Sequence, residues 1–445
     1  MRSGETGVHL AGLVVLGVYG MLAWASRAPE GPTLGLFFAC TGVVVVCTLL
    51  AWCAGRSAAS LTAAALAWGV AFRLLGFWAH PIYEDDFYRY LWDGYRTARA
   101  GDPYAQAPEA FFTDPSVPGR FQAILGQINY PEVPTIYGPA LQYLFALCCF
   151  IAPGELWPLK LLLNVADIAL LGLLSRIATP TSVLLYAWNP LVVKEIAFTA
   201  HPDGLLPLAT IAAWFCARAG RAWWAAALLA CAVAVKLPAL LLVPLVLRQP
   251  GSGAYRVFAL TLGALYLPLL VGGGSEWGGL QTFALQWEFN SALYGLLTLA
   301  VTPALARGLL AALVLAVVAV LYRRSFMLRD ARYLPRGDVI FAVLILAAPV
   351  INPWYWLWVL PFSVVYGSAW SWTASVALPM AYVTGLNLAT PELGAYGQPQ
   401  WVRWGEFGII GLAGIFGSLR RTRLTRPEGT TRTVPGLSRF NQIGF

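Results

Sequence analysis

Long apolar runs separated by short polar connections fill most of this 445-residue chain, from residue 8 to residue 419. A run of about 20 apolar residues is long enough to cross a bilayer as a single helix. Because 59% of the residues are hydrophobic and only 11% are charged, too few polar side chains remain to cover a water-facing surface. The pattern therefore predicts an all-α polytopic membrane protein.

Fourteen of these runs are candidate transmembrane helices, and the shorter ones leave a range of 11–14 spans. The fourteen are residues 8–25, 34–54, 58–78, 159–176, 181–199, 204–217, 222–235, 237–247, 257–271, 306–322, 338–352, 354–367, 372–388 and 404–419. Two further apolar stretches, 139–152 and 292–304, are shorter and carry Gly or Pro at their ends. We expect both to be re-entrant or interfacial helices that do not cross the membrane.

The arginines indicate an orientation. Short cytoplasmic loops retain Lys and Arg, and the basic connections at 56, 218–221, 248–256, 323–336 and 420–426 can all face one side. We expect that side to be the cytoplasm, with both termini inside and the polar stretch 79–158 outside. A topology in which 139–152 crosses would put Arg176 outside and His201 inside, and it fits the charges less well.

The chain then divides into four segments. These are N-terminal transmembrane helices at 1–78, an extracytoplasmic loop with interfacial helices at 79–158, a transmembrane bundle at 159–419 and a disordered basic tail at 420–445. The net charge of +8 lies in connections between apolar runs and not along one soluble face, which argues against nucleic acid as a partner.

The outer loop carries nine of the 21 carboxylates. Acidic residues favour the first turn of a helix and glycine often follows its end, so we expect a helix that begins at Glu84 to Asp86 and stops at Gly101. One face of this helix is polar and ionisable: Asp86, Arg89, Tyr90 and Asp93. The other face is apolar and suited to the membrane interface: Phe87, Leu91, Trp92 and Tyr95.

The adjacent carboxylates Glu84, Asp85 and Asp86 admit two interpretations. They can simply cap the helix, although capping needs only one or two of them. Adjacent carboxylates just outside a membrane also suit a general base or a metal site, because one ionised group raises the proton affinity of its neighbour.

Several motifs closely resemble one known family. The segments 84–94 (EDDFYRYLWDG), 101–104 (GDPY), 107–108 (AP) and 128–139 (INYPEVPTIYGP) are similar to the first outer loop of bacterial polyprenol-phosphate-mannose-dependent mannosyltransferases, of the GT-C glycosyltransferase class. Asn189-Pro190-Leu191 with Glu195, His201-x-Asp203, Lys236-Leu237-Pro238 and Asn352-Pro353-Trp354-Tyr355 follow in the family's order. The chain departs from the family in having two spans before the one that enters the loop, and in Tyr137-Gly138-Pro139, where relatives often have two prolines.

The resemblance implies a GT-C enzyme of the bacterial plasma (inner) membrane. Such an enzyme takes a sugar, here mannose, from a polyprenyl-phosphate carrier and passes it with inversion to a glycolipid or glycan acceptor on the periplasmic or outer face. Its loop carboxylate is the general base, which by match is Asp86, with Asp85 as second candidate. The resemblance leaves open whether a divalent cation, Mg²⁺ or Mn²⁺, binds Asp85, Asp86 and Asp203.

A departing lipid phosphate needs positive charge to stabilise it. The chain has only three lysines, Lys160, Lys194 and Lys236, all in or beside apolar runs where a charge is costly. Lys236 is our candidate for the phosphate, with Arg89 as the alternative. The competing structural explanation is a side chain that snorkels from a helix end.

Other polar residues have less specific signals. Lys194 and Glu195 lie on different sides of one helix, so we expect each to find a separate partner. His201 and Asp203 follow that helix, and Asp203 is either a helix cap or a second acidic group at an acceptor or metal site.

Three further residues are candidates for substrate binding: Tyr137, Asn352 and Tyr355. The aromatic residues at 354–358 suit an interfacial aromatic belt.

A transporter or lipid flippase is the alternative function. Such a protein carries charges along a pathway at the membrane midplane. Here most charges lie at the ends of apolar runs and cluster on one side, which favours an enzyme.

Overall fold

The computed structural model describes residues 2–56, 60–248, 251–327 and 333–424. Regular structure in these ranges is helical, apart from an isolated bridge between Phe289 and Val350. The α-helices are α1 (Arg2–Ala25), α2 (Leu34–Gly55), α3 (Leu61–Trp78), α4 (Asp86–Ala100), α5 (Gly119–Leu125), α6 (Pro139–Ile151), α7 (Trp157–Leu174), α8 (Pro180–Ala187), α9 (Pro190–Val192), α10 (Leu205–Arg218), α11 (Ala222–Val235), α12 (Val243–Val246), α13 (Ser252–Gly272), α14 (Trp277–Gln286), α15 (Leu293–Leu297), α16 (Pro303–Met327), α17 (Gly337–Ala347), α18 (Leu360–Tyr366), α19 (Ala369–Ala377), α20 (Gly385–Leu388) and α21 (Gln400–Leu424). The 3-10 helices are η1 (Pro108–Phe111), η3 (Pro202–Gly204), η4 (Leu237–Leu242), η5 (Pro353–Trp358), η6 (Leu378–Tyr382) and η7 (Pro391–Leu393), and η2 (Val193–Phe198) is a π-helix.

The all-helical membrane architecture predicted from the sequence is confirmed. Within the described ranges, six helices are long and apolar enough to cross a membrane: α1 from Gly4, α2, α3, α7, α13 and α16. Several apolar helices of 10–17 residues accompany them, among them α6, α11 and α17. The chain is therefore a multi-pass membrane protein, while the number of about fourteen spans stays a prediction.

Prolines interrupt several runs that we expected to form single helices. The expected span 181–199 is divided at Asn189, whose side chain accepts hydrogen bonds from the backbone N–H groups of Leu191 and Val192, so that a new helix begins at Pro190. Proline also lies in the first turn of the 3-10 helices η4, η5 and η6, which replace parts of the expected spans 237–247, 354–367 and 372–388. Proline removes a backbone donor and favours the first turn of a new helix. An apolar run is thus not equivalent to one continuous helix.

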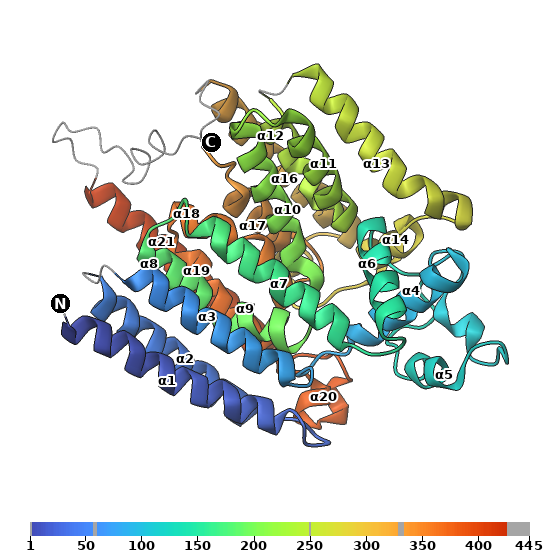
Figure 1. Ribbon diagram of the computed structural model, residues 1–445, viewed down its shortest axis with the longest axis horizontal. Helices are drawn as coiled ribbons and strands as arrows, with labels where there is room; N and C mark the ends of the chain where they lie inside the picture. Colours follow the sequence, from blue (N-terminus) through green and yellow to red (C-terminus); the bar gives the residue numbers. More distant parts are fainter. Residues whose placement is uncertain (1, 57–59, 249–250, 328–332, 425–445) are drawn as a thin grey trace.

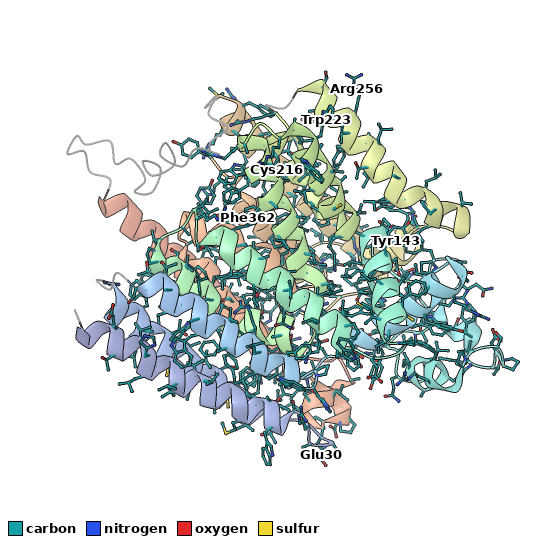
Figure 2. All side chains as sticks on the ribbon, in the orientation of Figure 1. Glu30, Tyr143, Cys216, Trp223, Arg256 and Phe362 are labelled. Carbon is teal, nitrogen blue, oxygen red and sulfur yellow. The ribbon has the colours of Figure 1, made fainter. Side chains whose placement is uncertain are left out.

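The outer loop forms a small folded unit at one end of the bundle. The long helices α1, α3, α7 and α13 run in a similar direction across Figure 1, and α4, α5, α6 and α14 gather at one end of them. We call this the loop end, because residues 79–156 lie there. Gly272, the last residue of α13, lies against the Gly101 carbonyl at the loop end, whereas Arg256 near the start of α13 lies at the opposite end (Figure 2).

The bounds of α4 agree with the sequence prediction, because it begins at Asp86 and stops where Gly101 adopts a left-handed conformation with φ of 71°. The surroundings of its apolar face were predicted wrongly. Trp92 and Tyr95 pack on Phe111 and Phe121 of the same loop, with ring centroids 5.3 Å and 4.1 Å apart. The loop's own small core, and not the membrane interface, covers this face.

Helix α6 begins and ends at the loop end. The hydroxyl of Tyr137, two residues before α6, lies 3.2 Å from the carboxylate of Asp86, and Gly154, just after it, lies against the side chain of Arg120. The stretch 292–304 contains only the five-residue helix α15 before α16 begins, too short to cross a bilayer. Both observations agree with the expectation that neither stretch crosses.

Buried polar contacts hold α3 and α7 together. The guanidinium of Arg73 lies 2.6 Å from the carboxylate of Asp167, and both side chains are 1% exposed. The Tyr186 hydroxyl donates to the same carboxylate at 2.6 Å, and Lys160 donates to the carbonyls of Gly76 and Ala79 at the end of α3. Lys160 is therefore fully used in closing that helix end. At the C-terminal end, α21 continues to Leu424, five residues into the expected tail, and 425–445 lie outside the described residues.

Candidate active site

A cavity of about 400 Å³ opens at the loop end, where segments distant in sequence meet. The outer loop contributes residues 83–89 and 129–137, and the bundle contributes Lys236, 283–289, 350–355 and 381–396. Most of the residues proposed from sequence for catalysis or substrate binding line this cavity: Asp85, Asp86, Arg89, Tyr137, Lys236, Asn352 and Tyr355. His201 and Asp203 lie behind the wall and contact lining residues. Pockets with a few converging polar groups are the usual place for substrate binding.

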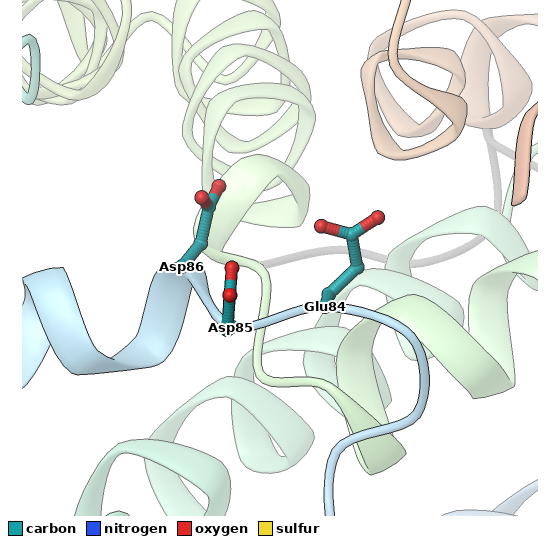
Figure 3. Close-up of side chains that lie close together, drawn as sticks. All are labelled: Glu84, Asp85 and Asp86. Atoms are coloured by element: carbon teal, nitrogen blue, oxygen red, sulfur yellow. The ribbon is translucent and has the colours of Figure 1, made fainter. Parts of the chain in front are cut away.

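The three adjacent carboxylates point to the same side of the backbone, where α4 begins (Figure 3). Their oxygens lie within 4.8 Å of one another. Asp85 occupies the position before α4, yet its side chain makes no capping hydrogen bond. It accepts a short hydrogen bond from the side chain of Asn129 instead. Capping of α4 therefore does not account for the triplet.

Burial and repulsion from neighbouring carboxylates raise the pKa of Glu84 and of Asp85. Burial, followed by the neighbouring charge of Asp86, raises the pKa of Asp85 to about 6. Burial is also the largest cause that raises the pKa of Glu84 well above its usual range, which the charge of Lys194 partly offsets. A buried carboxyl beside other carboxylates holds its proton more tightly. The surroundings of Glu84 thus favour its protonated form.

Asp86 has the contacts expected of a reactive carboxylate. Its side chain remains 33% exposed to the cavity. The Tyr137 hydroxyl donates to its Oδ2 at 3.2 Å, and Nε2 of His201 lies 3.9 Å from the same oxygen. The carboxylate is therefore held by one hydrogen bond, has an imidazole nitrogen beside it and is still accessible from the cavity.

His201 belongs to a buried polar network. Its Nδ1 lies 2.9 Å from Oε2 of Glu195, and its ring stacks on Trp354 with centroids 4.1 Å apart. Lys194 contacts Glu195 at 3.2 Å and donates to the Tyr382 hydroxyl at 2.7 Å. The expectation that Lys194 and Glu195 find separate partners is wrong, because both side chains reach Tyr382 from the π-helix η2.

Lys236 faces the cavity and does not snorkel. Its ammonium lies 3.3 Å from Oδ1 of Asp203, and its side chain is 14% exposed. The rings of Tyr137, Tyr355 and Trp358 lie 5.5–5.7 Å from it, within the range of a cation–π interaction. A positive charge is thus held at the cavity wall.

Asp203 is a counter-ion and not a helix cap. The indole N–H of Trp358 donates to its Oδ1 at 2.8 Å, in addition to the contact with Lys236. No capping hydrogen bond from its side chain is present in the described helices η3 and α10.

The aromatic residues at 354–358 do not form an interfacial belt. Trp354, Tyr355, Trp356 and Trp358 are at most 9% exposed. The side chain of Asn352 donates to the Tyr355 hydroxyl at 3.4 Å. These side chains pack inside the protein, and Trp354 and Tyr355 line the cavity, so the belt interpretation is corrected.

The guanidinium of Arg89 binds the backbone of the outer loop and is not left open for a phosphate. Its guanidinium donates to the carbonyls of Val133 at 2.9 Å, Tyr130 at 3.0 Å and Asn129 at 3.3 Å. With these carbonyls bound, Arg89 fixes the segment 129–133 against α4. Lys236, the other cation proposed for a phosphate, has its ammonium at the cavity wall beside Asp203.

The triplet can also hold a metal ion. Carboxylate oxygens are the ligands that Mg²⁺ and Mn²⁺ prefer, and those of Glu84, Asp85 and Asp86 are close enough to share one ion. Asp203, the third metal candidate from sequence, directs its Oδ1 to Lys236 and Trp358.

Sequence reasoning missed several residues of the cavity. Asn129 binds Asp85, and Tyr382 joins Lys194 to Glu195. Trp287 and Tyr396 line the cavity from the C-terminal half. Asn129 lies inside a recognised motif and could have been considered, but nothing local marks the other three, because their position depends on how distant segments pack.

One family model matches the chain. Its description is alpha-(1->6)-mannopyranosyltransferase, N-terminal domain, and it covers residues 3–249, more than half of the chain. No curated protein and no solved structure matches. The matched range includes the acidic triplet, His201, Asp203 and Lys236.

Proposed function

The chain belongs to the MptA/B family of alpha-(1->6)-mannopyranosyltransferases, which are membrane enzymes of GT-C type that depend on polyprenol-phosphate-mannose, and from this premise we propose that Asp86 is the general base of an inverting mannosyl transfer. The donor is a polyprenyl-phosphate mannose, and the acceptor is a hydroxyl of a glycan or glycolipid. The transporter alternative has no support from this membership.

The transfer is a single displacement. The acceptor hydroxyl oxygen attacks C1 of mannose while its proton passes to a carboxylate oxygen of Asp86. The bond from C1 to the phosphate oxygen breaks, its electron pair stays with the polyprenyl phosphate, and the configuration at C1 inverts. A positioned base contributes about 10²- to 10⁴-fold to such a reaction.

Lys236 supplies the positive charge that the departing phosphate needs. Its ammonium lines the same cavity as Asp86 and is surrounded by aromatic rings, which exclude water on that side. Electrostatic stabilisation is stronger where water is excluded. The neutralising contact with Asp203 at 3.3 Å holds the ammonium in place until the donor phosphate arrives.

The observation that carries this proposal is the position of the Asp86 carboxylate. It lies between the Tyr137 hydroxyl and the imidazole of His201 and lines the cavity that Lys236 also lines. Asp85 is less suited, because it is bound to Asn129. Glu84 is less suited, because its raised pKa favours the protonated form.

We further propose that the loop end faces the outside of a bacterial plasma membrane. Arg256 lies at the end of α13 opposite to the loop end, and short basic connections are typically retained in the cytoplasm.

Purified protein in lipid nanodiscs, with radiolabelled polyprenyl-phosphate mannose and short α-mannoside acceptors, tests the base. Asp86→Asn keeps the volume of the side chain and removes its basicity, so kcat should fall about 10²- to 10⁴-fold at an unchanged melting temperature. Asp85→Asn is the matched control and should retain more activity. Normal turnover in well-folded Asp86→Asn would refute the assignment.

A further inference from the structure

Three aromatic side chains from separate parts of the chain meet at the cavity. Tyr130 lies in the connection between α5 and α6, Trp287 directly follows α14, and Tyr396 precedes α21. The ring centroid of Tyr130 is 4.3 Å from that of Trp287 and 5.6 Å from that of Tyr396. Because these residues are more than 100 positions apart in sequence, tertiary packing alone brings them together.

The cluster stays partly open to the cavity. Tyr130 is 38% exposed and Tyr396 is 40% exposed, and all three residues line the cavity. Aromatic rings of this size normally bury most of their surface in a folded protein. Ring surface left exposed inside a substrate cavity is available for a ligand.

Tyr130 is held in an uncommon backbone conformation. Its φ is 50°, in the left-handed region that residues with a Cβ rarely adopt. Arg89 fixes the backbone there by donating to the carbonyl of Tyr130 at 3.0 Å and to the carbonyl of Asn129 at 3.3 Å. Strained positions of this kind concentrate at functional sites, where the surrounding structure enforces them.

The same contacts tie the ring cluster to the acidic triplet. Asn129, the neighbour of Tyr130, donates its side-chain amide to Asp85, and Arg89 lies one turn after Asp86 on α4. The position of Tyr130 relative to Asp86 is therefore fixed by α4 and not by a loose loop.

The surrounding polar groups suit a saccharide. Gln286, Glu288 and Asn387 line the cavity together with the three rings. A pyranose has an apolar C–H face that stacks on an aromatic ring and an edge of hydroxyls that bond to amides and carboxylates. Apolar surface with a few placed polar groups is the usual composition of such a site.

We propose that Tyr130, Trp287 and Tyr396 form the subsite that binds a pyranose ring of the acceptor, so that the acceptor hydroxyl is presented to Asp86. This inference rests on the proposed function for its assignment to the acceptor and not to the donor. It assigns recognition of the saccharide acceptor to the stacking of one sugar ring on these three side chains.

Substitution of each ring tests the subsite through the Michaelis constants. Tyr130→Ala, Trp287→Ala and Tyr396→Ala should each raise the acceptor KM about tenfold, as expected for loss of one aromatic contact, and leave the donor KM unchanged. Tyr130→Phe keeps the ring and should stay within twofold of the wild type. Phe112→Ala removes a ring that is 44% exposed on the same loop and should leave the acceptor KM unchanged.

Binding measured without the donor separates this inference from the proposed mechanism. Isothermal titration with an α-(1→6)-linked mannotriose should give the same Kd for the wild type and Asp86→Asn, and a Kd about tenfold higher for the three alanine variants. If the wild type binds the trisaccharide but Asp86→Asn transfers mannose normally, the base assignment fails and the subsite stands. If the alanine variants, with melting temperatures at the wild-type value, bind and use the acceptor normally, the subsite is refuted. Should an alanine variant melt early, the leucine variant at the same position, which keeps apolar volume without a ring, takes its place.

Discussion

Nε2 of His201 lies 3.9 Å from Oδ2 of Asp86, while Nδ1 of the same ring lies 2.9 Å from Oε2 of Glu195. The imidazole thus stands between two carboxylates. In either neutral tautomer one ring nitrogen turns a lone pair toward a carboxylate, whereas the doubly protonated ring donates on both sides. The stack on Trp354 fixes the plane of the ring. His201 is therefore placed to act on the position of the Asp86 carboxylate.

We predict that His201→Gln lowers kcat about tenfold or more with an unchanged donor KM. The substitution keeps an amide that can bond to Glu195 but removes the group that faces Asp86. A tenfold change in rate corresponds to about 1.4 kcal/mol of transition-state stabilisation. Steady-state kinetics would measure it, with Trp354→Phe as the control that preserves a stacking ring. A kcat within twofold of the wild type would show that His201 does not act on Asp86.

Lys236 and Asp203 give a second prediction, which separates folding from catalysis. Lys236→Met alone leaves the carboxylate of Asp203 buried and without its cation, which typically costs about 3–5 kcal/mol. Its melting temperature should therefore fall. The double variant Lys236→Met with Asp203→Asn removes both charges and should recover much of the lost stability.

The double variant should nevertheless transfer mannose poorly, because the donor phosphate has lost its cation. We expect kcat/KM for the donor to fall at least tenfold, and Lys236→Arg to retain part of it, since charge survives while geometry changes. A stable double variant with normal donor kinetics would move the phosphate role to another group.

The sequence predicted the parts of the site that local signals determine. The acidic residues at the start of α4 and Gly101 at its end were sufficient for both bounds of the helix, because charge in the first turn and a left-handed glycine act locally. Lys236 could be singled out because a lysine beside apolar runs is rare and costly.

The rest depends on tertiary packing, which spacing along the chain does not reveal. His201 and Asp86 are 115 positions apart and meet only because the short connection between η2 and η3 comes close to the start of α4. The aromatic residues at 354–358 have the composition of a membrane belt, but every residue of η5 is buried inside the protein, which composition does not reveal. The apolar run 181–199 likewise gave no sign, by its length, that a new helix begins at Pro190.

Asp93 gives a prediction for the pH dependence of stability. This carboxyl on α4 is 2% exposed and accepts hydrogen bonds from the side chains of Thr135 and Gln142. Burial raises its pKa from 3.8 to about 6. Between those values the folded protein holds a proton that the unfolded chain releases, so the free energy of unfolding falls as pH rises from about 4 to about 6.

Asp93→Asn removes this dependence and keeps an acceptor for Thr135 and Gln142. The variant should gain about 2 kcal/mol of stability relative to the wild type between pH 4.5 and pH 7.5, because part of the effect of the raised pKa already falls below pH 4.5. Melting temperatures at both pH values measure the difference. Asp114→Asn is the control, because hydrogen bonds from Ser116 lower the pKa of that exposed carboxyl, so its titration lies below pH 4.5 and its stability difference should be the same at both pH values. An Asp93→Asn difference that does not change with pH would contradict the prediction.

The last prediction concerns which side of the membrane holds the cavity. Gln106 lies exposed in the outer loop, and Ala219 lies exposed just after α10, beside Arg218 and Arg221. Because basic connections are retained in the cytoplasm, Gln106→Cys in an otherwise cysteine-free chain should react with a membrane-impermeant maleimide in intact cells. Ala219→Cys should react only after the cells are permeabilised.

The cysteine-free parent must first retain mannosyl transfer, since seven native cysteines are replaced and two of them, Cys40 and Cys47, are buried in α2. Equal labelling of both variants after permeabilisation shows that both thiols are accessible. Protection of Gln106→Cys with labelling of Ala219→Cys in intact cells would invert the orientation. The acidic triplet and Lys236 would then face the cytoplasm, and the donor would have to be presented from that side.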